Sequence, residues 1–312
     1  MKPFAFVFPG QGSQSVGMLD AWGDHPVVAQ TLAEASDALG EDIGRLIHEG
    51  PKEALALTTN TQPVMLVAAV AAWRVWCADG GAQPAAVAGH SLGEYTALVA
   101  AGVLTLQDAL PLVRFRAQAM QDAVPVGVGG MAAILGMDAE GVKAGCAEAA
   151  AATGEAVEAV NFNDPKQTVI AGTKAAVEKA CEVLKAAGAK RALPLPVSAP
   201  FHSSLMKPAA ERLKEKLAAT AFVVPAMAMV NNIDVAVAST PDAIRDALYR
   251  QAFGPVRWVE SVQALKARGL MHVIECGPGK VLSGMVKRID AELVTGCVLD
   301  PASLAEVKAL LA

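Results

Sequence analysis

The pentapeptide Gly89-His90-Ser91-Leu92-Gly93 has the G-x-S-x-G pattern, in which a serine occupies a tight turn between a strand and a helix. The apolar residues 85–88 predict a short buried strand before it, and a helix is predicted over residues 94–102. Glycine is needed two residues to either side because so sharp a turn crowds its neighbours. A plain glycine-rich turn has the same pattern, but this setting favours Ser91 as a nucleophile.

A serine hydroxyl needs a base within hydrogen-bonding distance before it can attack a carbonyl carbon. His202 is the favoured base because it lies in the irregular segment 198–203, between two predicted domains, where clefts commonly form. Of the other four histidines, His25 and His48 lie in polar segments and His272 lies in an apolar strand. The last, His90, is next to the serine itself. No acid close to His202 in sequence indicates an orienting partner.

The glycine-rich loop 9–14 follows an apolar strand predicted over residues 4–8. Such a loop at the end of a strand places backbone and short polar groups over a cleft, and Gln11 could donate a hydrogen bond to an oxyanion. Ser15 occupies the position where a dinucleotide-binding fingerprint needs its third glycine. The loop is therefore either an ordinary turn or part of an oxyanion site.

Arg114 and Arg116 lie in a helix whose other residues are largely apolar, which indicates that one of them faces inward. A buried arginine is costly unless it is paired, and its planar guanidinium suits a carboxylate. The partner of Arg116 would be either a distant side chain, in an ordinary salt bridge, or the carboxylate of a substrate.

Composition narrows the class of protein. The 26 lysines and arginines and 31 aspartates and glutamates give a net charge of −5 without long runs of either sign, which argues against nucleic-acid binding. The five cysteines are widely spaced and form no CxxC pair, so reduced thiols are expected and no metal site. Residues 63–73, the longest uncharged apolar run, are too few to span a membrane, and residues 4–8 are too few for a signal peptide. A cytoplasmic protein is expected.

Strands and helices alternate in the first half of the chain and again near its end, with later strands predicted at 227–230 and 271–275, which predicts a mostly parallel sheet flanked by helices. Pro63 is expected in the first turn of a buried helix that ends near residue 78. Between these parts, strands and helices follow in the order β-α-β-β-α-β, at 131–135, 139–150, 157–162, 167–171, 174–187 and 191–197. This order matches the ferredoxin-like motif. We predict an α/β fold with a discontinuous, hydrolase-like catalytic domain, 1–126 and 198–312, and an inserted ferredoxin-like domain, 127–197.

Taken together, the motifs resemble those of the malonyl-CoA:acyl carrier protein transacylase family over nearly the whole chain. The segments that carry the resemblance are 6–14, 61–63, 89–95, Arg116, 160–163, 194–202, 230–232 and 277–280.

The resemblance implies a site in which Ser91 is the nucleophile and His202 the base. It further implies that Gln11 and the backbone N–H of Leu92 form the oxyanion hole, that Arg116 holds the malonyl carboxylate, and that the main-chain carbonyl of Gln251 orients His202. No metal or redox cofactor is implied.

The partners implied are malonyl-CoA and an acidic acyl carrier protein, bound by a monomer that uses neither nucleic acid nor a membrane. Phe201 is a bulky residue where related domains line the acyl pocket, which leaves the acyl selectivity open. The basic residues that could meet the carrier are Lys185, Lys190, Arg191, Lys280, Lys287 and Arg288.

Four alternatives stay open at this point. The chain could serve malonate decarboxylation, or transfer another acyl group from coenzyme A, by the same chemistry. It could be an esterase or thioesterase of the α/β-hydrolase kind, although those enzymes place their histidine near the C-terminus and a long segment follows His202 here. It could also be a non-catalytic scaffold that binds a carrier protein.

Overall fold

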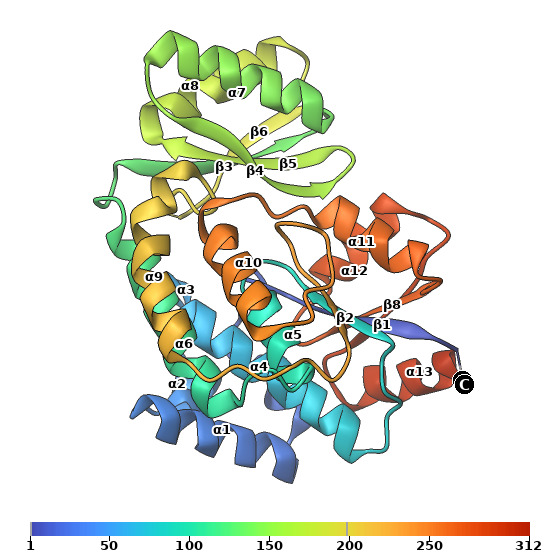
Figure 1. The fold of residues 1–312 in the computed structure, drawn as a ribbon. Coiled ribbons are helices and arrows are strands. Elements are labelled where there is room, and N and C mark those ends of the chain that lie inside the picture. Colours follow the sequence, from blue (N-terminus) through green and yellow to red (C-terminus); the bar gives the residue numbers. More distant parts are fainter. Residues whose placement is uncertain (1, 198) are drawn as a thin grey trace.

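Two β-sheets organise the chain, and helices pack against both (Figure 1). The structure is a computed structural model that describes residues 2–197 and 199–312. The smaller sheet lies above the larger one in this view, and the connections between them pass along one side.

The larger sheet has five parallel strands in the order β7-β2-β1-β8-β9. Their bounds are β1 Phe4–Phe8, β2 Ala86–Gly89, β7 Ala228–Val230, β8 His272–Cys276 and β9 Val294–Val298. Every residue of β1 is buried, as expected for a central parallel strand covered on both faces. The strands β1 and β2 are neighbours, so the loops after their carboxyl ends meet at one edge of the sheet.

The helices of this part are α1 Pro26–Leu39, α2 Ile43–Glu49, α3 Lys52–Ala56, α4 Thr58–Ala78, α5 Gly93–Ala100, α6 Leu106–Asp122, α9 Lys207–Ala219, α10 Pro241–Phe253, α11 Trp258–Ala267, α12 Val281–Ile289 and α13 Pro301–Leu311. Short 3₁₀ turns lie at Asp20–Trp22 and Ser204–Met206. The predicted α/β fold, with a parallel sheet flanked by helices, is confirmed.

The expected start of helix α4 was wrong, because Pro63 lies inside this helix and not in its first turn. Side chains support the extra turn: the Thr61 hydroxyl donates to the Leu57 carbonyl, and the Gln62 amide donates to the Thr58 hydroxyl. In the part of the chain that the structure describes, α4 alone is long and apolar enough to cross a membrane, and 83% of its apolar window is buried inside the protein. It is a core helix.

The smaller sheet has four antiparallel strands in the order β4-β5-β3-β6. Its elements are β3 Gly129–Leu135, α7 Ala139–Thr153, β4 Val157–Asp164, β5 Gln167–Thr173, α8 Lys174–Ala186 and β6 Arg191–Pro194. Both helices cover the face turned away from the larger sheet (Figure 1). The element order agrees with the predicted one, and the ferredoxin-like interpretation and the division at 126/127 and 197/198 remain our proposals.

Strand β6 ends at Pro194, three residues before the predicted end. Pro194 and Pro196 have no N–H to continue the ladder, so the chain leaves the sheet there. Ser198, which begins the proposed second part of the large domain, lies outside the described residues.

Backbone hydrogen bonds and a salt bridge are among the contacts that join the small sheet to the rest of the molecule. Val256, between α10 and α11, accepts from the Phe162 N–H at 3.0 Å and donates to the Val160 carbonyl at 2.8 Å. Arg288 on α12 pairs with the buried Asp164 at the end of β4, with Nε and Oδ2 2.6 Å apart. The small sheet is therefore held over one edge of the large one.

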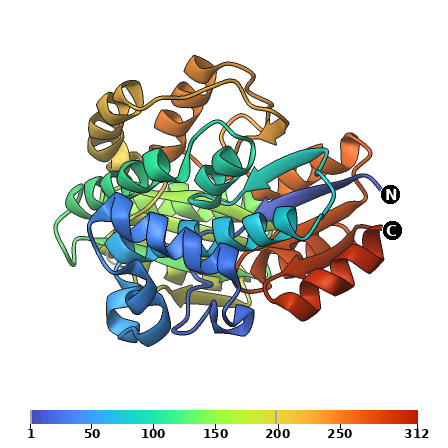
Figure 2. The same ribbon diagram turned by 90° about the horizontal axis from the view of Figure 1, so that it is seen from below.

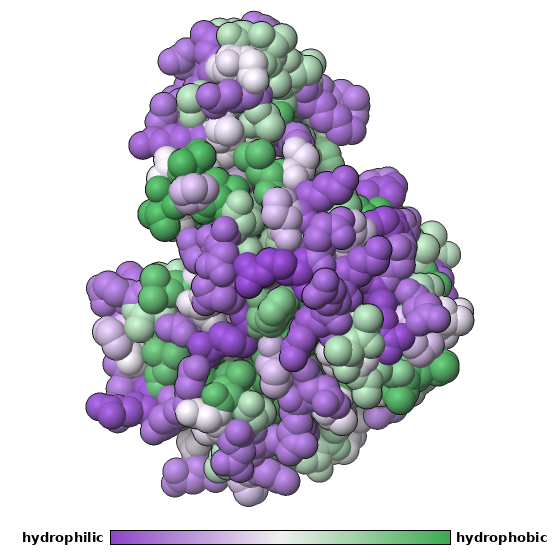
Figure 3. Space-filling model, turned by 60° about the vertical axis from the view of Figure 1, so that its left-hand side comes forward, coloured by the Kyte–Doolittle hydropathy of each residue, from purple (hydrophilic) through white to green (hydrophobic). Residues whose placement is uncertain are grey.

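The two ends of the chain lie side by side, as Figure 2 shows, and the Lys2 N–H donates to the Leu311 carbonyl at 2.9 Å. The face in Figure 3 is hydrophilic over most of its area, with hydrophobic residues gathered on the lower part of the upper lobe. Exposed apolar side chains include Val126 and Val128 before β3 and Leu193 on the edge strand β6.

Candidate active site

Ser91 lies on the turn between β2 and α5, where its backbone has φ 52°. The two flanking glycines are required by close contacts: a Cβ on Gly89 would lie 1.9 Å from Gly93 main-chain atoms, and one on Gly93 would lie 2.0 Å from the Phe8 carbonyl oxygen. The turn 89–93, the nucleophile elbow, therefore packs closely against its own helix and against strand β1, and Ser91 lines the cavity.

Asn232, in the loop after β7, holds this turn from both sides. Its Oδ1 accepts from the Ser91 N–H at 2.7 Å, and its Nδ2 donates to the Gly89 carbonyl at 2.7 Å. The side chain is fully buried. The sequence offered the motif at residues 230–232 but no signal for this role, because Asn232 is 141 residues from Ser91.

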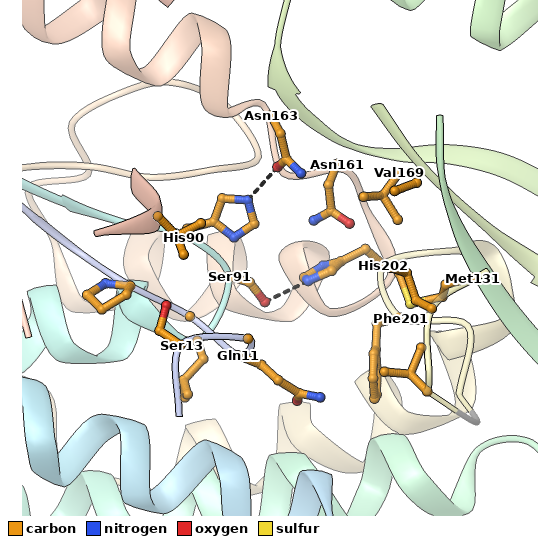
Figure 4. A pocket seen from close by; sticks show the side chains of 18 of the residues that line it. Gln11, Ser13, His90, Ser91, Met131, Asn161, Asn163, Val169, Phe201 and His202 are labelled. Carbon is orange, nitrogen blue, oxygen red and sulfur yellow. Dashed lines mark hydrogen bonds between the residues drawn. The ribbon is translucent and has the colours of Figure 1, made fainter. Parts of the chain in front are cut away.

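His202 is hydrogen-bonded to Ser91, with its Nε2 2.6 Å from the Ser91 Oγ (Figure 4). Its Nδ1 lies 2.9 Å from the Gln251 carbonyl oxygen. A carbonyl only accepts hydrogen bonds, so Nδ1 carries the proton and Nε2 is free to accept the serine proton. Burial, with the nearby Arg116 charge as the second cause, lowers the pKa of His202 to about 3. The imidazole is therefore neutral and able to act as a base.

Arg116 on α6 is buried, with 2% of its surface exposed. Its guanidinium donates to the Gln62 Oε1 at 2.5 Å, the Gln251 Oε1 at 3.1 Å and the Ser91 Oγ at 3.2 Å. All three acceptors are neutral, and its Nε has no partner among the described residues. Arg114, by contrast, pairs with Glu41 at the surface, with Nη2 and Oε2 2.7 Å apart. The inward arginine is Arg116, and its charge is left without a directly bonded carboxylate.

Two residues that line the cavity with Ser91 have a backbone donor that is free within the described part of the chain. The N–H groups of Leu92 and Gln11 have no acceptor among the residues that the structure describes. The Gln11 side chain is engaged through its oxygen, which accepts from the Thr58 hydroxyl at 3.0 Å. A Cβ on Gly10 would lie 2.6 Å from the His90 carbonyl oxygen, so the loop packs directly on the elbow. An oxyanion beside Ser91 could accept from both backbone groups.

The other histidines lie elsewhere. His90 turns away from Ser91, and its Nε2 lies 2.8 Å from the Asn163 Oδ1 (Figure 4). His25 caps helix α1, and His48 is bonded to Asp20 at the surface. His272 lies half-buried in strand β8.

The cavity around Ser91 has a volume of about 380 Å³. Its far wall comes from the inner face of the small sheet and from the segment after β6, and it combines apolar side chains with the amides of Asn161, Asn163 and Gln167. Phe201 borders this wall next to His202 (Figure 4). The lining side chains of this wall include Met131, Ala133, Val169, Leu195 and Val197. The site thus lies between the two sheets, as the position of His202 in a connecting segment indicated.

No group of three or more histidine, cysteine, aspartate or glutamate side chains that could hold a metal ion occurs within residues 2–197 and 199–312. All five cysteines are free thiols. The chemistry available from the described residues is nucleophilic attack by a serine with a neutral histidine base, beside a buried positive charge.

The model of the acyl transferase domain family matches residues 5–297. The chain belongs to this family. The resemblance inferred from the motifs is therefore confirmed, and the chain is an acyltransferase and not an α/β-hydrolase esterase.

Similar proteins align with this acyltransferase over nearly its whole length. The malonyl CoA-acyl carrier protein transacylase of Salmonella typhimurium is 54% identical over 305 residues, which are 97% of this chain and 98% of the relative. The crystal structure of an acyl-carrier-protein S-malonyltransferase from Burkholderia pseudomallei is 69% identical, with a TM-score of 0.97, over 99% of this chain and 100% of that one. A malonyl-transacylase solved in complex with its type II PKS acyl-carrier protein is 50% identical, also with a TM-score of 0.97, over 99% and 100% of the two chains.

Proposed function

We propose that this acyltransferase moves the malonyl group of malonyl-CoA to the phosphopantetheine thiol of an acyl carrier protein in fatty-acid synthesis. The observation that carries the proposal is the guanidinium of Arg116, which is buried beside Ser91 with neutral acceptors only. A malonyl thioester ends in a carboxylate that would complete this arrangement. The names of the relatives support the same substrates.

In the first half-reaction, the Ser91 Oγ attacks the thioester carbonyl carbon while His202 Nε2 takes the hydroxyl proton. The backbone N–H groups of Leu92 and Gln11 stabilise the oxyanion. The C–S bond then breaks, the coenzyme A sulfur leaves with the proton from His202, and a malonyl ester remains on Ser91.

The second half-reaction reverses these steps with a new thiol. The phosphopantetheine thiol gives its proton to His202 as its sulfur attacks the ester carbonyl carbon. The C–O bond breaks, the proton returns to the Ser91 Oγ, and malonyl carrier protein is released. The Gln251 carbonyl keeps the imidazole in the tautomer that both halves need.

The remaining parts of the proposal concern the protein's setting. We propose a cytoplasmic monomer that needs no cofactor beyond its two substrates and that meets the acidic carrier with a local group of basic side chains. Of the six basic residues named above, all exposed, Lys287 is bonded to the Leu293 carbonyl and Arg288 to Asp164. Lys280, next to the cavity residue Val281, is the best placed of the rest.

Labelling tests the proposal. The protein is incubated with malonyl-CoA, digested and analysed by mass spectrometry. We expect one malonyl group on the peptide that contains Ser91, its loss in Ser91→Ala, and its retention in Ser13→Ala, which removes another serine that lines the cavity. An undiminished rate of malonyl transfer by Ser91→Ala would show that the nucleophile is a different residue.

A further inference from the structure

Glu94 is a buried acid that the proposed mechanism does not use. It lies in the first turn of α5, three residues after Ser91, and none of its surface is exposed. Its Oε2 accepts from the Asn232 N–H at 3.0 Å and from the Gln251 Nε2 at 2.9 Å. Its Oε1 is buried and has no partner among the described residues. A buried carboxylate is costly unless a positive charge compensates it.

The compensating charge is Arg116, and the amide of Gln251 lies between the two. Gln251 donates to Glu94 through Nε2 and accepts from Arg116 through Oε1. The carboxylate thus fixes which end of the amide faces the guanidinium, and the amide of Gln251 bridges the two charged groups. Glu94 is the internal counter-charge of Arg116 when the site is empty.

A substrate that ends in a carboxylate changes this balance. Its negative charge would enter beside Arg116, so that two carboxylates would share one guanidinium in a site of low dielectric. The other charged or titratable groups that face Glu94 do not offset the second charge. Asp234 is itself acidic and is held by Arg250, and Tyr95 is buried beside the same guanidinium.

We propose that the substrate carboxylate replaces Glu94 as the counter-charge of Arg116, and that Glu94 takes up one proton from solvent when the malonyl group binds. The proton goes to Oε1, because Oε2 already accepts two hydrogen bonds. Only a proton is gained, and no bond to carbon is made or broken. Glu94 is a positioning residue that couples substrate binding to pH. This inference rests on the proposed malonyl substrate.

Burial raises the pKa of Glu94 to about 7, against the opposing hydrogen bonds of Gln251 and Asn232 and the charge of Arg116. The empty enzyme therefore holds Glu94 mostly ionised above that pH. Binding of a carboxylate must then neutralise Glu94, so the affinity for malonyl-CoA should fall above neutral pH by up to about tenfold per pH unit. Acetyl-CoA has no terminal carboxylate, so its affinity should not show this extra fall.

The test is calorimetry of malonyl-CoA binding to Ser91→Ala, which binds without acylation, at about pH 8 in buffers that differ in ionisation enthalpy. We expect proton uptake with malonyl-CoA beyond that with acetyl-CoA, which controls for the coenzyme A phosphates. Ser91→Ala with Glu94→Gln should bind malonyl-CoA without the extra uptake. Ser91→Ala with Glu275→Gln should retain it, because Glu275 is an equally buried acid that is bonded to Ser283 at helix α12.

The inference would be overturned if the Glu94→Gln variant still took up the extra proton with malonyl-CoA. If the extra proton uptake were lost in His202→Ala and not in Glu94→Gln, the proton would be assigned to His202. If the Glu94 variant does not fold, equal proton uptake with malonyl-CoA and acetyl-CoA in Ser91→Ala alone overturns it. Failure of native protein to form malonyl-Ser91 is a separate result, which would reject the proposed function itself.

Discussion

At the scale of single residues, the site depends on two strained backbones. Ser91 and His202 have φ 52° and 66°, in the left-handed region that costs a non-glycine residue on the order of 1–3 kcal/mol. Each is held there by a partner distant in sequence: Asn232 binds the Ser91 N–H, and Gln251 binds the His202 ring. The strain aims Oγ and Nε2 at each other, so hydrogen bonds made elsewhere maintain the geometry of the reaction.

The role proposed for Arg116 is to distinguish substrates by the group at the far end of the acyl chain. Arg116→Ala should lower kcat/KM for malonyl-CoA by roughly 2–4 kcal/mol, on the scale of losing one partner of a buried charge pair, while acetyl-CoA turnover changes little. Lysine should restore only part of the loss, since it offers a point charge in place of a fork. Steady-state kinetics with both substrates measure this.

Arg114→Ala is the matched control for this prediction. Arg114 lies on the same helix and pairs with Glu41 at the surface, so its loss should leave both substrates unaffected. If Arg116→Ala instead slows both substrates equally and lowers the melting temperature, the arginine is structural and the malonyl preference has another origin.

The pKa of His202 makes a prediction about pH. A histidine whose pKa is lowered to about 3 is almost entirely unprotonated at pH 5 and above, so the base should remain available in mildly acidic solution. The rate of acylation at saturating malonyl-CoA should therefore change little between about pH 8 and 5, whereas a histidine of ordinary pKa would lose about thirtyfold. Rapid mixing measures this rate, and saturation separates it from binding. A decline with a midpoint near the ordinary histidine value would contradict the prediction.

Several site residues could be predicted from the sequence because their signals are local. Ser91 lies inside a five-residue pattern, His202 lies in an irregular connecting segment, and Arg116 interrupts an apolar helix. Glu94 and Asn232 could not be given roles in this way. The roles proposed for them depend on contacts that span 138 and 141 residues, which no local spacing encodes.

At the scale of elements, the order and type of the predicted strands and helices of the small sheet agree with the structure, because each is short, periodic and bounded by turn residues. The differences arise where tertiary contacts override local preference. Helix α4 extends before Pro63 because threonine and glutamine side chains support its first turn. Strand β9 was not predicted, since Val294–Val298 is an edge strand that is only half-buried along most of its length.

The nucleophile elbow depends on close packing between elements. Gly89→Ala would place a Cβ 1.9 Å from the backbone of Gly93, where no flexible side chain can yield. We expect a loss of more than about 3 kcal/mol in the free energy of unfolding, measured with urea, together with loss of acylation.

Gly44→Ala is the comparison for Gly89→Ala. Gly44 lies in helix α2, where a Cβ would meet its nearest neighbour at 3.7 Å, an ordinary contact. Alanine favours the helix over glycine, so this variant should be unchanged or up to about 1 kcal/mol more stable. If Gly89→Ala unfolds at the same urea concentration as the native protein, the elbow is less tightly packed than the structure indicates.

At the scale of the whole molecule, the site is assembled from both sheets. The large part supplies the proposed nucleophile, the proposed base and Arg116, and the inner face of the small sheet supplies the opposite wall of the cavity. Val256 and the pair Arg288–Asp164 hold the two parts together. A carrier protein must therefore deliver its thiol into a cavity whose walls come from both parts, and its contacts are expected around that opening.

The last prediction concerns how an acidic carrier approaches a protein whose own net charge is −5. Overall repulsion must be overcome by basic side chains near the opening, and exposed Lys280 adjoins the cavity residue Val281. Lys280→Glu should raise KM for the carrier about three- to tenfold in the transfer from malonyl-enzyme, and raised salt should weaken native transfer more than that of the variant. Starting from malonyl-enzyme excludes effects on malonyl-CoA binding.

Lys185→Glu is the control, because it makes the same change in net charge at the end of α8, on the side of the small sheet turned away from the site (Figure 1). This variant should have little effect on KM for the carrier. Equal effects of the two variants would show that net charge alone governs the encounter and that Lys280 has no special place in it.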